Sequence, residues 1–312
     1  MSEKEKIVLT SAPPPVHSIA VVFIMTIVFV GLFPSMESVD RVATVDTFTR
    51  RVFPDLITVE QMAYIRLAIA GVIWATSFHT MCLSPGWIQT TNYLKGTRLL
   101  RAPNTLYGIK TMFPFTSWAW NMLGVSFTLS GYIALKQEAS PLLLRSALFF
   151  WEASAPFSFL VATVIRYAIW PGVLKGDGDT TNLKKLRNKL MHNANVMMSL
   201  TEAALLGGLP VHWKHVSIGP LVGVAYILFT WAMSTSWNDT SKVGPQFIYF
   251  FFDTTLPGYT PTIALLVLLL VLMLFFSFFA ACDFLLGLVP FGVVGHALFA
   301  LGLGSIMMRF RD

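Results

Sequence analysis

The fold of this chain is decided by residues 190–210, which read LMHNANVMMSLTEAALLGGLP. The stretch is apolar and long enough to cross a bilayer, which takes roughly 20 residues. Polar side chains recur in it at i, i+3, i+7 and i+10, at His192, Asn195, Ser199 and Glu202. On an α-helix this spacing places all four on one stripe. Ionisable residues inside a span are costly unless they face protein or water, so the stripe predicts a functional, protein-facing surface.

The whole composition is that of a membrane protein. The 312 residues are 55% hydrophobic and 12% charged, with a mean hydropathy of +0.65, whereas soluble domains have about 25% charged residues. Apolar runs recur along the chain at 17–36, 62–84, 113–135, 144–172, 190–210, 216–237, 260–282 and 286–307. We therefore expect an all-α, polytopic transmembrane helix bundle of seven or eight spans. The last run follows its neighbour closely and contains Pro290, so a re-entrant hairpin is the alternative there.

The positive charge of the chain indicates its orientation in a membrane rather than binding to a nucleic acid. The net charge of +6 comes from short loops, as the positive-inside rule describes. With eight spans, fourteen Lys and Arg side chains lie in the tails and loops on one side and five on the other. Both termini are therefore expected in the cytosol. The first apolar run is expected to be a retained span, because the Glu3–Lys6 flank has no net positive charge, unlike that of a signal peptide.

We divide the chain into four segments. A disordered cytosolic tail covers 1–16, an extra N-terminal span and loop 17–61, a membrane core 62–282, and a C-terminal span or hairpin 283–312. The two cysteines have no metal-ligand spacing.

His192 and Glu202 have different expected roles. His192 is a candidate general base, since a free imidazole titrates near neutrality; alternatively it only lies at the membrane interface beside Lys189. Glu202 lies about 15 Å deeper along a helix. It must be paired or protonated there, and it is too distant to bond to His192 within one helix.

Further polar residues lie in three other stretches. Thr116 and Ser117 follow Pro114 at the start of a span, where they are helix caps or a nucleophile. Asp253 either orients His192 or caps the next span. Two further sets serve helix contacts: a small polar stripe at Ser117, Asn121, Gly124 and Thr128, and Glu152 and Arg166, each expected to pair with another helix.

Three pieces of sequence carry a family resemblance. Phe115-Thr116 heads a span; His192 is followed ten residues later by Glu202; and the stretch from Ile248 to Asp253, IYFFFD, precedes Pro257-Gly258. Together, over roughly 62–282, they resemble the androgen-induced membrane hydrolase family, whose members hydrolyse fatty acid esters of hydroxy fatty acids. An extra span before the core and Phe250 in place of the family's Pro depart from that pattern.

The resemblance implies an intramembrane lipid esterase in which Thr116 is the nucleophile and His192 the base. Asn195 would help hold the oxyanion, and Ser199, Glu202, Asp253 and Ser117 would support the site. The substrate would enter from the bilayer, and no metal, organic cofactor or nucleic acid is implied. The alternatives are a non-catalytic transport or binding protein, and an accessory subunit of a membrane complex.

Overall fold

A computed structural model describes residues 8–175, 178–237 and 240–311, and these are mostly helical. The chain forms two compact units, which are described separately. Unit 1 comprises 1–32, 79–114 and 220–272, and unit 2 comprises 33–78, 115–219 and 273–312. Helix α11 (Ile218–Met233) falls almost wholly in unit 1, and α13 (Thr260–Leu286) contributes to both units.

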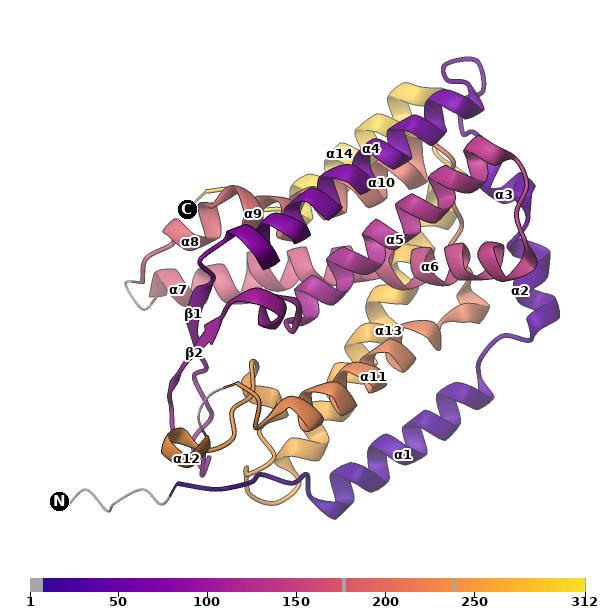
Figure 1. Cartoon of the computed structure of the whole chain (residues 1–312). Helices are drawn as coiled ribbons and strands as arrows, with labels where there is room; N and C mark the ends of the chain where they lie inside the picture. Colours follow the sequence, from indigo (N-terminus) through magenta and orange to yellow (C-terminus); the bar gives the residue numbers. More distant parts are fainter. Residues whose placement is uncertain (1–7, 176–177, 238–239, 312) are drawn as a thin grey trace. The chain divides into compact units, whose positions relative to one another are not determined.

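Unit 1 combines helices with a small antiparallel sheet (Figure 1). Its elements are α1 (Val16–Gly31), η1 (His79–Leu83), β1 (Trp87–Thr90), β2 (Pro103–Leu106), η2 (Gly108–Met112), α12 (Thr240–Val243) and η6 (Phe250–Phe252). In the sheet Trp87 lies opposite Leu106 and Thr90 opposite Pro103. These strands lie in the segment that the sequence marks only as a basic loop.

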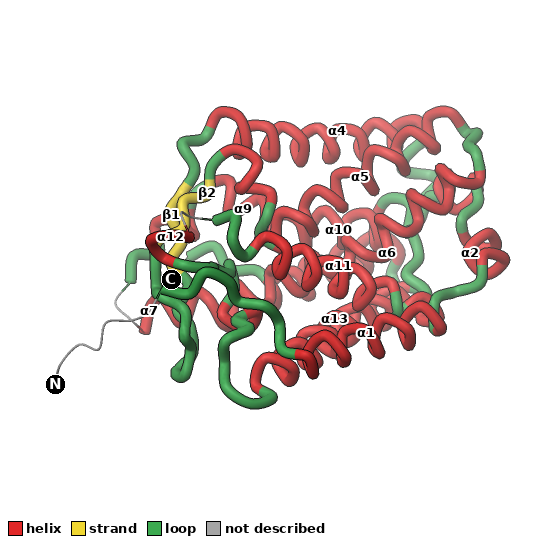
Figure 2. Tube along the Cα trace, turned by 60° about the horizontal axis from the view of Figure 1, so that its bottom comes forward, coloured by secondary structure: helices red, strands yellow, loops and turns green. Residues whose placement is uncertain are grey.

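Unit 2 is built from helices (Figures 1 and 2). They are α2 (Met36–Val42), α3 (Val45–Thr49), α4 (Val59–Phe78), α5 (Phe115–Lys136), α6 (Pro141–Val164), η3 (Ile165–Ile169), α7 (Trp170–Lys175), α8 (Thr181–Lys184), α9 (Leu186–Lys189), η4 (Leu190–Ala194), α10 (Asn195–Leu205), η5 (Trp213–His215) and α14 (Gly292–Met307). Three short segments of the chain, η1, η3 and η4, are π-helical turns.

Several helices could cross a membrane, as the composition predicts. Four described helical stretches are long and apolar enough: Val59–Leu83, Pro141–Lys175, Trp213–Met233 and Thr260–Leu286. The bent pair Val16–Gly31 and Met36–Thr49 makes a fifth if it counts as one span. Helix α14, with 16 residues, is shorter. The predicted seven or eight spans are therefore not confirmed.

The stretch 190–210 differs most from its prediction. A continuous helical run of α9, η4 and α10 extends from Leu186 to Leu205, with η4 as a π-helical turn inside it. This run is not among the stretches that are long and apolar enough to cross a membrane, so a span here is not confirmed. Leu206 leaves the helical region with φ −102° and ψ −105°. Gly207 and Gly208 follow immediately, and glycine favours non-helical backbone.

In the core of unit 2, α4 and α5 pack together as a helical hairpin, and α6 packs against α5. Gly131 lets α5 pack closely against Leu67 of α4. Ser140 caps α6 by accepting the Leu143 N–H, and Pro141 occupies the first turn of that helix, where its missing N–H costs nothing.

The predicted small polar stripe of α5 faces α4. The Ser77 hydroxyl donates to Asn121 over 2.7 Å, and the Trp74 Nε1–H donates to Thr128 over 2.9 Å. The expected packing and hydrogen-bonding role of this stripe is confirmed.

Candidate functional site

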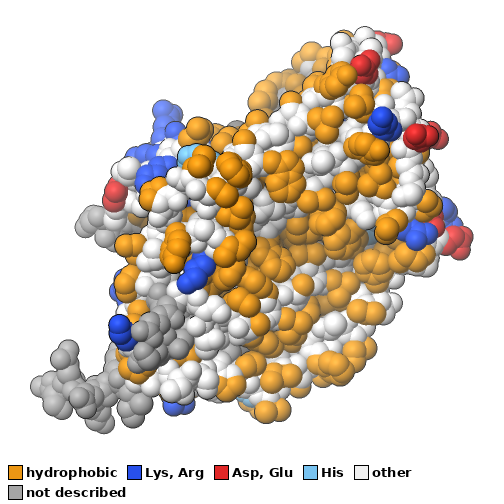
Figure 3. Space-filling view, viewed as in Figure 1, with side chains coloured by type: hydrophobic (Ala, Val, Ile, Leu, Met, Phe, Trp, Pro, Cys, Tyr) orange, Lys and Arg blue, Asp and Glu red, His pale blue; other side chains and the backbone are white. Residues whose placement is uncertain are grey.

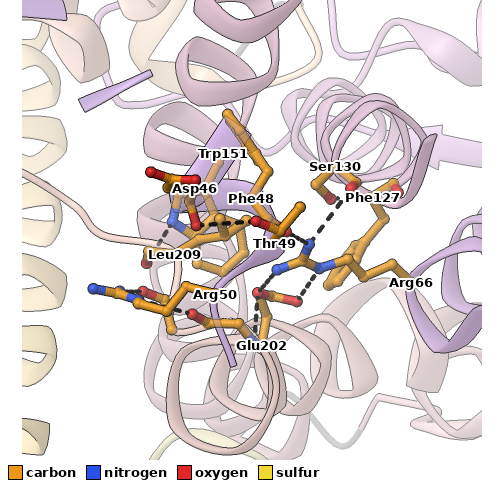
Figure 4. A network of polar contacts seen from close by, with 12 residues as sticks. Asp46, Phe48, Thr49, Arg50, Arg66, Phe127, Ser130, Trp151, Glu202 and Leu209 are labelled. Carbon is orange, nitrogen blue, oxygen red and sulfur yellow. Dashed lines mark hydrogen bonds and ion pairs between the residues drawn. The ribbon is translucent and has the colours of Figure 1, made fainter. Parts of the chain in front are cut away.

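Glu202 is fully buried and paired, as its depth in an apolar stretch predicts. Its carboxylate receives two hydrogen bonds from Arg66 of α4, at 2.9 Å from Nε and 2.6 Å from Nη2 (Figure 4). Both side chains have 0% of their surface exposed. The Gly207 N–H adds a third bond to Oε1 at 3.2 Å. Bidentate Arg–carboxylate geometry of this kind is among the strongest polar contacts in proteins.

Arg66 ties four segments of unit 2 together. Besides Glu202, its Nη1 donates to the carbonyls of Phe48, at 2.6 Å, and Ser130, at 3.4 Å (Figure 4). Arg66 therefore joins α3, α4, α5 and α10. Arg66 is not among the site residues predicted from the sequence, although it is the single charged residue in the apolar run 62–84. An ionisable residue in such a run is a signal for a buried partner.

The π-helical turn η4 carries His192. The imidazole is half-buried and lies beside the backbone of Asn188 and the charge of Arg187, both in the preceding helix α9. Single π-turns inside helices occur frequently at functional sites. The turn packs against both α5 and α6 of unit 2.

The two other predicted stripe residues, Asn195 and Ser199, are both buried, but only the side chain of Asn195 has a hydrogen-bond partner among the described residues. Asn195 is 3% exposed, and its Oδ1 accepts the N–H of Val196. Ser199 is 0% exposed, and its hydroxyl has no hydrogen-bond partner among the described residues.

Thr116 lies in the first turn of α5, where it is half-buried. It begins a helical series at i, i+4, i+7, i+11 and i+14 whose later members are buried: Trp120, Leu123, Phe127 and Ser130. Ser117, next in the chain, instead shares the stripe of Asn121 that faces α4. Within the described residues, no hydrogen bond joins Thr116 to His192.

Asp253 closes a local turn in unit 1. Its Oδ1 accepts from the Thr255 N–H at 2.8 Å and from the Thr255 hydroxyl at 2.7 Å. Burial raises the pKa of the nearby Tyr93 phenol, and the Asp253 charge adds to this effect. The phenol therefore stays protonated and donates to Gln246 and to the Phe247 carbonyl. His192 belongs to unit 2, so the suggested orienting role of Asp253 stays a prediction.

A second buried polar pair lies in unit 2. Glu152 of α6 accepts from the His212 N–H at 2.9 Å and contacts His215 Nδ1 at 2.7 Å. Glu152 also lines a hollow of about 200 Å³ whose other walls are mainly apolar. Arg166 donates to the Ser305 and Met308 carbonyls at the end of α14. The expected pairing of both charged residues with other elements is thus confirmed.

A second hollow, of about 610 Å³, is lined by Arg50, Arg51 and neighbouring polar residues. Thr116 and His192 are in the walls of neither hollow.

No family model, curated protein or solved structure matches this chain.

Proposed function

We propose that the protein is an intramembrane lipid esterase, with Thr116 as nucleophile and His192 as base. The observation that carries the proposal is that two stripes converge on one buried ion pair. The α5 series beginning at Thr116 reaches Ser130, and the α10 stripe beginning at His192 reaches Glu202. Arg66 donates to the Glu202 carboxylate at 2.9 Å and to the backbone carbonyl of Ser130 at 3.4 Å.

This shared anchor relates the depths of the two candidate groups. At a rise of 1.5 Å per residue, Thr116 lies about 21 Å before Ser130 and His192 about 15 Å before Glu202. The turn η4, which carries His192, also packs on α5. Along the helix axes Thr116 is thus about 6 Å farther from the shared anchor than His192, and the proposal requires a rotamer change or one bridging water to bring the two side chains together. Catalytic hydrogen bonds are often long without substrate.

The proposed reaction is acyl transfer in two steps. The Thr116 hydroxyl attacks the ester carbonyl carbon while His192 accepts its proton, because an unassisted hydroxyl is a weak nucleophile. The tetrahedral intermediate collapses, and the alcohol leaves with the proton from His192. Water then attacks the acyl-threonine with His192 again as base, which releases the fatty acid and restores Thr116.

We assign the buried Arg66–Glu202 pair a structural role rather than a role in the reaction. Glu202 accepts three hydrogen bonds from Arg66 and Gly207, so its carboxylate is occupied. A proton or ligand path through Glu202, which the transport alternative requires, would have to break this pair.

For orientation, we propose that both termini face the cytosol, as the excess of basic residues indicates. An even number of spans is then required, as in the eight-span topology on which the count of basic residues was made. Asn238 of the sequon Asn238-Asp239-Thr240 lies outside the described residues. On the eight-span topology with cytosolic termini it carries no glycan in a eukaryotic host, whereas a glycan would place this loop in the lumen and contradict that topology.

The activity is tested on purified protein with a panel of fatty acyl esters and a fluorophosphonate probe. Thr116→Ala and His192→Ala should each abolish turnover and probe labelling, and the double variant should be no worse than either one. Thr201→Ala and His79→Ala are the matched controls. Thr201 is a half-buried threonine of α10 and His79 is an exposed histidine, and both should keep wild-type rates.

If folded wild-type protein neither hydrolyses any ester nor takes up the probe, the esterase proposal is wrong. A binding or accessory role then takes its place. If Ser117→Ala abolishes labelling while Thr116→Ala does not, the nucleophile is reassigned by one residue.

A further inference from the structure

The short segment that ends α14 and follows it, Ser305–Arg309, connects both π-helical turns of unit 2. From η3, Arg166 donates to the carbonyls of Ser305 and Met308, and the Tyr167 hydroxyl donates to that of Ile306 at 2.7 Å. These carbonyls lie at the C-terminus of α14, where helix carbonyls lack partners of their own. The segment is therefore capped by side chains from η3.

From η4, a single side chain holds the backbone that follows. Asn193 donates from Nδ2 to the Arg309 carbonyl at 2.8 Å, and its Oδ1 accepts the Arg309 N–H at 3.0 Å. Asn193 is 1% exposed. A buried asparagine whose amide pairs with both main-chain groups of one residue fixes the distance and the angle between the two segments.

Two further contacts hold the same region. The Arg309 guanidinium lies over the Trp170 ring at 5.3 Å, and α14 packs along α10 (Figure 1). A π-helical turn departs from the favoured i→i+4 pattern, so its persistence needs surrounding support. Both turns receive it from the residues 305–309.

We propose that this segment, which we name the C-terminal clasp (305–309), positions the η4 turn, with Asn193 as the positioning residue for its chain neighbour His192. The catalytic part rests on the proposed esterase function. The clasp sets where the imidazole lies relative to α5. Asn193 does not touch the substrate; it acts through the backbone of η4.

The chain offers matched variants that separate the backbone bonds from side-chain effects. Arg309→Pro removes the N–H that donates to Asn193, while Arg309→Ala removes only the side chain over Trp170. The extended backbone of Met308, at φ −93° and ψ 152°, is compatible with a following proline. Asn193→Ala removes both bonds, and Arg311→Ala, at an exposed site, is the control.

The first readout is independent of activity. Hydrogen exchange of the amides in 188–196 should accelerate about tenfold or more in Asn193→Ala and Arg309→Pro, because local opening no longer breaks the clasp bonds. Arg309→Ala and Arg311→Ala should exchange like wild type. Unchanged exchange in both clasp variants, with the thermal midpoint retained, would overturn the clasp.

The second readout is a split between kcat and KM for ester hydrolysis. Asn193→Ala and Arg309→Pro should lower kcat about tenfold or more with little change in KM, since a displaced base affects chemistry more than binding. Faster exchange with unchanged kcat would overturn the positioning role. Faster exchange in a protein whose wild type is inactive would instead reject the esterase proposal and leave the structural clasp standing.

Discussion

At the scale of the residue, Arg66 and Glu202 show how an apolar protein keeps two charges. Neither side chain has exposed surface, and two hydrogen bonds join them directly. A buried ion pair is a weak source of net stability, but removing one partner leaves an uncompensated charge. The pair therefore matters mainly through what happens when it is broken.

Glu202→Ala should lower the free energy of unfolding by about 3–5 kcal/mol, because the Arg66 guanidinium is left unpaired. Arg66→Met combined with Glu202→Leu should cost less than the two single substitutions added together. Thermal unfolding in detergent, followed by tryptophan fluorescence, measures this double-mutant cycle. Strict additivity would show that the two side chains do not depend on each other.

A second prediction concerns Glu152, which is bonded to the His212 N–H and to His215. Glu152→Ala leaves the His212 N–H without its acceptor, and each such buried group costs about 1–3 kcal/mol. Glu152→Gln keeps one carbonyl oxygen for that N–H, so it should destabilise clearly less than alanine. The same unfolding assay compares the two, and equal losses would mean that the acceptor itself is unimportant.

At the scale of the element, the end of α10 is fixed by the close approach of backbone to the ion pair. A side chain on Gly207 would overlap the Arg66 guanidinium and the Glu202 carboxylate. The helix therefore stops where a residue without Cβ is required, and the Gly207 N–H can reach Oε1.

Gly207→Ala should therefore destabilise the protein by about 1–3 kcal/mol, the usual range for overpacking. The matched control is Gly71→Ala in α4, where an added Cβ meets nothing within 4 Å. That substitution should be neutral or stabilising by roughly 0.5–1 kcal/mol, because glycine is unfavourable inside a helix. A Gly207→Ala protein that melts with the wild type would contradict the steric argument.

The elements also show what the sequence can and cannot predict. Apolar runs locate the long helices α4, α6, α11 and α13 because length and hydropathy are local properties. The cost of burying a carboxylate predicts that Glu202 is paired. It does not identify Arg66, which lies 136 residues away, since the sequence states the need for a partner and not its position. The π-helical turn η4 could not be predicted either, because its bonds to residue 309 are tertiary contacts.

At the scale of the whole molecule, many large hydrophobic side chains are exposed, and they cover much of the face seen in Figure 3. Helix α13 presents a series of exposed side chains at helical spacing: Ile263, Val267, Leu270, Leu274 and Phe278. The intervening Leu265, Leu269 and Leu272 are buried. Large apolar patches mark interaction or membrane surfaces. This exposed series lies along α13, which has the highest mean hydropathy of the candidate spans.

Spin labels on α13 in lipid vesicles should distinguish the two faces. Labels at Val267, Leu270 and Leu274 should be reached by oxygen dissolved in the bilayer and shielded from a water-soluble relaxation agent. The free cysteines Cys82 and Cys282 are replaced beforehand. Labels that respond chiefly to the aqueous agent would show that this face does not lie in lipid.

The separation of Arg66 from Glu202 in the sequence has a consequence for biosynthesis. Ribosomes add about 5–20 residues per second, so α4 is made roughly 7–27 s before the carboxylate it needs. A membrane-spanning α4 would lack the counter-ion of Arg66 during that interval. Insertion of an unpaired arginine at the centre of a span costs about 2.5–3.5 kcal/mol on insertion scales. The nascent chain must therefore hold α4 near the interface, beside water or the translocation machinery, until α10 emerges. Chains truncated before residue 202 should never complete this step and are the forms that cellular quality control would meet.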